Sequence, residues 1–144
     1  MVDFKIVIGT KDGKTHQKEI KSPESDNLLK RRINETISGN LIGFDGYEFL
    51  ITGGSDKCGF PMRKGIQEPR KMILLGTGVG FCGKKRRFGK KTYRKNQKGL
   101  VRRRTVCGER VTKIIHQVNM KVTKMGSQSL GEAPAPAEEA PKEE

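Results

Sequence analysis

The sequence predicts a mainly β protein: a compact β-barrel-like domain with one short helix, a long basic arm and a disordered acidic C-terminal tail. Three observations favour this fold class. Alternating apolar and polar residues recur in several short segments, which is the pattern of half-buried strands. Glycine accounts for 18 of the 144 residues, and only 33% of residues are hydrophobic. A small core built from short strands and one small helix is typical of a compact barrel or sandwich.

Composition divides the chain into two regions. Residues 1–125 carry the predicted strands and form the β-barrel domain, which includes the basic arm at about residues 77–105. Residues 126–144 are rich in Ala, Pro and Glu. Because these residues cannot build a core, we expect an acidic low-complexity tail without fixed structure.

The N-terminal segment predicts a β-hairpin. Residues 2–8 alternate between apolar and polar side chains, which indicates a strand. Asp12 and Gly13 tolerate the positive φ angles of a tight turn, so residues 15–20 are expected to pair back as a second strand.

A short helix is expected after the hairpin. Ser22 and Pro23 suit the start of a helix, because Ser caps free N–H groups and Pro favours the first helical position. Gly39 is expected to end this helix. The apolar residues that fall on one face at helical spacing are Leu28, Leu29, Ile33 and Ile37.

Three further strands are predicted. Residues 47–51 alternate in polarity, and residues 71–75 form a short apolar run before Gly76. The clearest long strand lies near the end of the domain. Its predicted core face is Ile114, His116, Val118, Met120 and Val122.

The charge distribution points to a polyanionic partner. The chain has 30 Lys and Arg against 16 Asp and Glu, a net charge of +14. The acidic tail holds five Glu in its last thirteen residues, so the remainder is more basic still. No apolar run is long enough to cross a bilayer and no secretory pattern is present, so we expect a soluble cytoplasmic protein that binds nucleic acid.

The basic arm is the main candidate for RNA binding. No carboxylate occurs from Pro69 through Gly108, and no periodic pattern crosses the arm. Long segments without a pattern are usually functional or disordered, so we expect the arm to gain its order from a partner. RNA is favoured over a membrane because the arm lacks an apolar helical face. Its cations are Lys84, Lys85, Arg86, Arg87, Lys90, Lys91, Arg94, Lys95, Lys98, Arg102, Arg103 and Arg104.

Aromatic residues are interleaved with these cations. Such rings either stack on unpaired bases or fold back on the small core, and the sequence leaves both alternatives open. These residues are Phe81, Phe88 and Tyr93.

Catalytic and metal-binding patterns are weak. Gly78, Gly80 and Gly83 fit a nucleotide-binding pattern, but no helical pattern follows to present N–H groups to phosphates. The three cysteines lie far apart, and the histidines lack partners at a catalytic spacing. We therefore expect no enzyme activity, no cofactor, no metal and no small-molecule substrate. The residues considered are Cys58, Cys82, Cys107, His16 and His116.

The run ITGGSDKCGFPMRKG over residues 51–65 resembles the signature loop of the sixth small-subunit ribosomal protein of archaea and eukaryotes, the e-type family. The resemblance continues in GNLIGFDGYEF before the loop and PRKMILL after it, and covers nearly all of residues 1–126. The chain is similar to the short archaeal form of this family. The resemblance implies a β-barrel-like body docked on small-subunit ribosomal RNA beside neighbouring ribosomal proteins, without catalytic activity.

The signature loop is interpreted as a docking surface for RNA. Its glycines, Gly53, Gly54 and Gly59, allow close approach of the backbone to a phosphate or positive φ angles. Asp56 is expected to order the turn rather than to act as an acid or base. Phe60, Pro61 and Met62 are expected to anchor the apolar side of the loop. The cations assigned to RNA contact here are Lys57, Arg63, Lys64 and Arg70.

Together with the basic composition, the resemblance implies a structural constituent of the small ribosomal subunit that binds and stabilises ribosomal RNA. The alternative is an RNA-binding regulator or RNA chaperone that is not stably bound to ribosomes.

Overall fold

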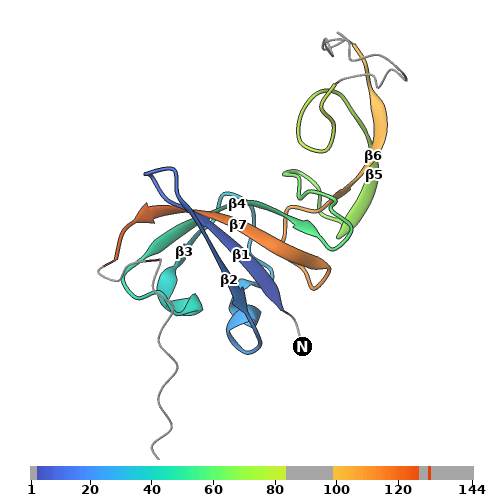
Figure 1. The fold of residues 1–144 in the computed structure, drawn as a ribbon. Coiled ribbons are helices and arrows are strands. Elements are labelled where there is room, and N and C mark those ends of the chain that lie inside the picture. The colour runs from blue at the N-terminus through green and yellow to red at the C-terminus, as the bar shows by residue number, and fades with distance from the viewer. Residues whose placement is uncertain (1–2, 84–98, 127–129, 131–144) are drawn as a thin grey trace, which may run out of the picture.

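The computed structural model describes residues 3–83, 99–126 and 130, and Figure 1 shows their arrangement. The mainly β class predicted from the sequence is confirmed. The strands are β1 (Phe4–Gly9), β2 (Thr15–Ile20), β3 (Thr36–Ser38), β4 (Glu48–Asp56), β5 (Arg70–Leu75), β6 (Arg102–Cys107) and β7 (Ile115–Lys124), and the short 3-10 helices are η1 (Glu24–Leu28) and η2 (Gly39–Ile42).

The strands form two sheets that do not close into a barrel. The larger sheet has the order β2-β1-β7-β4-β3, and β5 and β6 form a separate two-stranded sheet. Figure 1 shows this ribbon projecting away from the larger sheet. The prediction of a barrel-like domain is therefore wrong in its closure. β2 and β3 are the two edge strands of the larger sheet, so closing it into a barrel would require them to pair with each other. With only three residues, β3 offers few hydrogen bonds for such a pairing.

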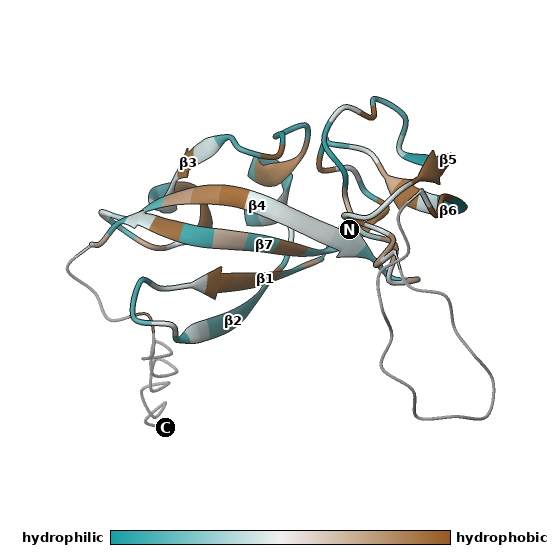
Figure 2. Ribbon diagram, turned by 90° about the horizontal axis from the view of Figure 1, so that it is seen from above, coloured by the Kyte–Doolittle hydropathy of each residue, from teal (hydrophilic) through white to brown (hydrophobic). Residues whose placement is uncertain are grey.

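The larger sheet carries the main hydrophobic core on one face. β1 pairs antiparallel with β2, as the hairpin prediction expected, and parallel with β7. Phe4, Ile6 and Ile8 of β1 are buried at alternate positions, and so is Phe49 of β4. Figure 2 shows hydrophobic residues along β1, β4 and β7, whereas β2 is largely hydrophilic. Each fully buried side chain of this size contributes about 1.5 to 3 kcal/mol to the stability of the sheet.

The predicted helix after the hairpin is wrong. Only residues 24–28 form a helical turn, and Lys30 then adopts a positive φ of 68°. The Lys30 N–H donates to the carbonyl of Val111 at 2.9 Å, so a hydrogen bond to a distant part of the chain replaces the one that would continue the helix. Leu28 is buried as expected, but Ile37 reaches the core from strand β3.

The predicted core face of the last strand is correct only in its second half. Val118, Met120 and Val122 are buried, whereas Ile114 is 43% exposed and His116 is also exposed. Ile115 occupies the core in their place. The physical reason is a register shift between β4 and β7 at Ser55 and Asp56, because one irregular step moves the following side chains to the other face.

The two adjacent glycines of β4 differ in their surroundings. A Cβ at Gly54 would lie 2.3 Å from the carbonyl oxygen of Gln117 in β7, and 3.0 Å from the Sδ of Met62. A Cβ at Gly53 would meet nothing within 4 Å. Gly54 is therefore required where β4 and β7 approach closely, which is a role inside the protein that the interpretation of a phosphate contact did not foresee.

Replacing Gly54 with Ala is expected to lower the free energy of unfolding by about 2 kcal/mol, because the new methyl group must displace backbone of β7. Urea unfolding of Gly54→Ala and of the matched Gly53→Ala variant measures this difference. Gly53→Ala is expected to change stability by less than about 1 kcal/mol, since its added methyl group meets open space. Equal losses in the two variants would contradict the assignment.

The β5–β6 ribbon has a small core of its own. Leu75, Phe81 and Val106 are buried together with Ile66, which lies in the loop before β5. Of the two alternatives for Phe81, packing on the core is confirmed. Phe88, Tyr93 and nine cations of the basic arm, residues 84–98, lie outside the described residues, as does most of the predicted acidic tail.

The end of the basic arm has regular structure, contrary to expectation. Arg102, Arg103 and Arg104 lie in β6 and pair with residues of β5. The sequence did not reveal this strand because three consecutive cations hide the alternation that indicates a strand. Of the predicted tail, Leu130 is described and packs, partly buried, against the main core.

Candidate nucleic-acid interface

The signature loop is a turn built around the carboxylate of Asp56. One oxygen, Oδ1, accepts a hydrogen bond from the Phe60 N–H at 2.8 Å, and the Asp56 carbonyl accepts one from the Gly59 N–H at 3.0 Å. Gly59 has a φ of +82°, which favours glycine. Met62 is buried in the main core. These contacts confirm that Asp56 orders the turn and that Met62 anchors it.

Asp56 also joins the loop to the β5–β6 ribbon. Its side chain is fully buried and pairs through Oδ2 with Nη2 of Arg70, the first residue of β5. The Sγ of Cys107, in β6, lies 3.4 Å from the same oxygen. The guanidinium of Arg70 lies 5.2 Å from the centre of the Phe60 ring. One carboxylate therefore fixes the loop, β5 and β6 together.

The electrostatics of this contact favour the charged pair. Burial alone would raise the pKa of Asp56, but the hydrogen bonds from the Phe60 N–H and from Arg70 outweigh it and hold the pKa below its usual value. The hydrogen bond to Asp56 raises the pKa of Arg70 in turn. The assignment of Arg70 to RNA contact stays a prediction, but its guanidinium is already engaged inside the protein.

The other loop cations differ in their freedom. Lys57 and Lys64 are exposed. Arg63 is partly buried and donates from Nη1 to the carbonyl of Val79 at 2.8 Å, which links the loop to the Gly-rich turn after β5. Lys57 and Lys64 are thus the loop cations most accessible to a phosphate.

The cations of β6 are divided between the two faces of the ribbon. Arg103 pairs with Leu74 across the ladder, while Arg102 pairs with Leu75 and Arg104 with Ile73. Because side chains alternate along a strand, Arg103 lies on one face and the other two on the opposite face. Arg104 lies 5.8 Å from the centre of the Phe81 ring. Within the described part of the chain, none of the three arginines forms an ion pair.

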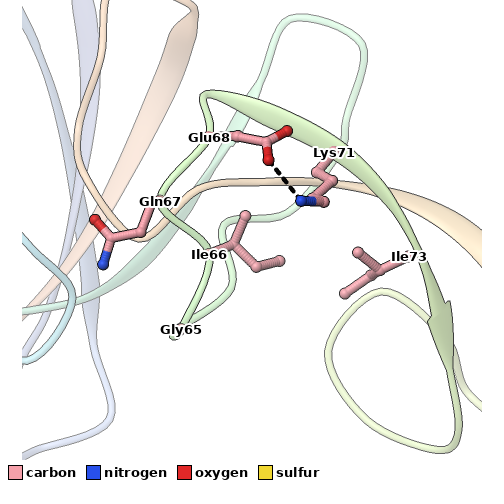
Figure 3. Close-up of a pocket in the computed structure, with 6 residues that line it drawn as sticks. All are labelled: Gly65, Ile66, Gln67, Glu68, Lys71 and Ile73. Atoms are coloured by element: carbon pink, nitrogen blue, oxygen red, sulfur yellow. Dashed lines mark hydrogen bonds and ion pairs between the residues drawn. The ribbon is translucent and has the colours of Figure 1, made fainter.

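A shallow hollow of about 410 Å³ lies beside β5, on the face of the ribbon that carries the small core. Figure 3 shows its lining, in which Glu68 and Lys71 form an ion pair of 2.5 Å at the rim. Ile66 and Ile73 supply apolar surface. Because Lys71, the cation of this lining, already pairs with Glu68, the hollow offers no unpaired cation to a phosphate group.

The thiols show no shared site. Cys58 and Cys82 are exposed and Cys107 is buried. Burial raises the pKa of the Cys107 thiol to about 11, and the neighbouring Asp56 carboxylate acts in the same direction. Among residues 3–83, 99–126 and 130, no three His, Cys, Asp or Glu side chains are grouped to hold a metal ion.

In the same residues, no helix is long and apolar enough to span a membrane.

Comparison with known proteins decides the family. Residues 4–134 match the family model described as ribosomal protein S6e. The chain belongs to this family. The resemblance noted in the signature loop is thereby confirmed, and the S6e match extends across both sheets of the fold.

Archaeal relatives agree with the S6e assignment. The small ribosomal subunit protein eS6 of Methanococcus maripaludis strain C7 is 39% identical over 137 residues, which cover 94% of this chain and 98% of that protein. The eS6 protein of Methanospirillum hungatei is 38% identical over 144 residues, covering 98% of each chain. That of Methanosphaera stadtmanae is 35% identical over 141 residues, covering 97% and 98%.

Beyond strand β6 and the role of Gly54, sequence reasoning missed two features of the candidate site in this S6e chain. The Asp56–Arg70 pair joins residues fourteen positions apart whose partnership no local pattern indicates. Residues 71–75 look like a buried apolar strand, yet Met72 and Leu74 are 62% and 64% exposed. The one available signal that it faces a partner was the absence of carboxylates from Pro69 through Gly108.

Proposed function

We propose that the protein is a structural constituent of the small ribosomal subunit, located in the cytoplasm, that binds and stabilises ribosomal RNA next to other ribosomal proteins. The observation that carries this conclusion is the S6e family match over residues 4–134, together with relatives named as small ribosomal subunit proteins over almost the full chain. A ribosomal structural role requires no catalytic centre.

The proposed mechanism is neutralisation of phosphates along the RNA backbone. Contacts of Lys and Arg with phosphates release counterions and give tight binding that depends steeply on salt. The five-stranded sheet provides a rigid body, and the ribbon with residues 84–98 provides the cations, since no carboxylate occurs from Pro69 through Gly108. Lys57 and Lys64 extend the basic surface to the signature loop. Reduced repulsion between phosphates then allows RNA helices to pack closely.

Sedimentation of tagged protein from cells tests this function. We expect the chain to remain with small subunits through a high-salt wash, because many contacts within an assembled particle dissociate slowly. A matched control is a tagged basic protein of similar charge from outside the ribosome, which the same wash should remove. Release of the chain at moderate salt would contradict the proposal and favour the alternative of a free RNA-binding regulator or chaperone.

A further inference from the structure

We propose that the exposed face of the β5–β6 ribbon holds an unpaired nucleotide of the RNA, with the base on the apolar side chains of Met72, Leu74 and Val101 and the phosphate on Arg103. These three apolar residues are called the apolar strip. The proposal rests on the proposed function and adds to it a preference for unpaired RNA, which phosphate neutralisation alone does not supply.

The apolar strip is a continuous feature of one face. Met72 and Leu74 occupy alternate positions of β5 and therefore lie on the same face. Val101 directly precedes β6 and lies beside Gly76, because a Cβ placed on Gly76 would be 4.0 Å from the Cγ1 of Val101. The exposed fractions are 62% for Met72, 64% for Leu74 and 50% for Val101. Figure 2 shows the hydrophobic character of β5 in this ribbon.

The strip lies on the side of the ribbon away from its own core. Leu75 and Val106 point to the opposite face, where they pack with Phe81. Within the residues that the structure describes, nothing covers Met72 or Leu74. Exposed apolar side chains gathered on one element are typical of a binding site, because covering contiguous apolar surface removes it from water, whereas single exposed apolar residues are common on any protein surface. A two-stranded ribbon also gains stability when its open face is covered.

Charge favours RNA as the occupant. Arg103 lies directly opposite Leu74 in the ladder, so the strip carries a cation at its centre. At one end, the same face begins with Arg70, which is fixed to the signature loop through Asp56. At the other end, β5 and β6 lead in sequence into the nine cations of residues 84–98. By contrast, the cation in the hollow on the other face, Lys71, is already paired with Glu68, so the hollow is the poorer candidate.

The chemistry of the strip selects an unpaired nucleotide over a duplex. Side chains of Met, Leu and Val offer no hydrogen bonds to base edges in a groove, but they pack well against the flat face of an unstacked base. Residues opposite each other in a ladder have Cβ atoms about 5 Å apart. A base on Leu74 therefore places its own phosphate within reach of the Arg103 guanidinium.

Binding measurements with the full chain test this inference. The probes are a fluorescent RNA stem with a single-stranded poly(U) tail and the same stem without the tail. The unmodified protein is expected to bind the tailed RNA more tightly. The double variant Met72→Ser, Leu74→Ser is expected to lose about tenfold in affinity for the tailed RNA, because the apolar contact of two side chains with one base is removed.

Salt dependence separates the two parts of the site. The Met72→Ser, Leu74→Ser variant should keep the slope of log K against log salt, because it loses no charge. Arg103→Gln should reduce the magnitude of the slope by about 0.7, the value for one phosphate of a single strand. The matched control is Ile114→Ser, Met125→Ser, which alters two apolar residues that are also exposed, at 43% and 55%, but lie outside the ribbon. It should bind like the unmodified protein.

The outcomes distinguish this inference from the proposed function. If the strip variant binds the tailed RNA as tightly as the unmodified protein does, the inference is overturned while the RNA-binding function stands. If the unmodified protein binds neither RNA, the function itself fails. A photoreactive benzophenone residue in place of Leu74, in assembled small subunits, gives an independent readout that does not depend on polar substitution. Crosslinks to RNA support the inference, and crosslinks to a protein overturn it in favour of a protein contact.

Discussion

Replacing Asp56 with Ala is expected to lower the free energy of unfolding by about 3 kcal/mol. The change leaves Arg70 without its counter-charge, the Phe60 N–H without an acceptor, and a cavity next to the Cys107 thiol. The value lies at the lower end for a buried ion pair, since Arg70 is 38% exposed and water can reach it after the change. Urea unfolding at neutral pH measures the loss.

The control for this variant is Glu68→Ala, which removes the other ion pair at the ribbon. Both Glu68 and Lys71 are about half exposed, so their contact is screened by water and its loss should change stability by less than about 1 kcal/mol. If Glu68→Ala and Asp56→Ala are equally destabilising, the burial of Asp56 does not control the junction of the loop and the ribbon.

The carboxylate of Asp56 should also make the free energy of unfolding depend on pH. Because the pKa of Asp56 is lower in the folded protein than in the unfolded chain, its contribution is fully present above the unfolded pKa and is lost as pH falls through the folded pKa. Stability should therefore decrease below about pH 4. Asp56→Asn cannot titrate and should show a flatter decrease in the same urea series. The pKa of Glu35 is also lowered, by the Arg32 N–H and by Arg31, so Glu35 accounts for some loss of stability at low pH that remains in this variant.

Neutralising four cations of the basic arm is expected to weaken binding to RNA by about a thousandfold at 0.1 M salt. The variant replaces Lys84, Lys85, Arg86 and Arg87 with Gln. Each lost phosphate contact should reduce the magnitude of the salt slope by about 0.7 to 0.9, so the expected reduction is about three units. Titration of a fluorescent small-subunit RNA fragment at several salt concentrations measures both quantities.

A second variant with the same net charge provides the control. It replaces four exposed lysines of the larger sheet and its loops with Gln: Lys11, Lys14, Lys21 and Lys121. If position governs binding, this control should keep its affinity within about threefold of the unmodified protein. If overall charge governs binding, the two variants will weaken RNA binding equally, and the arm has no special place in the interface.

Local patterns were sufficient for part of the fold. The β1–β2 hairpin follows from alternation on both sides of Asp12 and Gly13, and the register in which Phe4 faces Ile20 agrees with it. The helix was mispredicted because apolar spacing over residues 28–37 suits a helical face equally well, whereas hydrogen bonds to residues 109–111 decide the backbone there. Neither the spacing nor the capping residues carry information about that distant segment.

The sequence also indicated which loop cations are free to meet a partner. Lys57 and Lys64 were assigned from the signature loop, and both are exposed, while their contact with RNA stays a prediction. Gly54 was assigned to close approach of a phosphate, but its Cα faces the backbone of β7. The apolar strip could not be anticipated, because an apolar strand looks the same in sequence whether its second face is buried or open.

The family, the mainly β class and the position of the cations follow from the amino-acid sequence, since they depend on residue identity and on patterns within a few positions. The open sheet, the pairing of Arg70 with Asp56, and the shared face of Arg103 and Leu74 follow from the folded chain alone. These depend on which distant strands pair and in which register. A shift of one residue in β5 or β6 would exchange the two faces of the ribbon, and no local pattern specifies that choice.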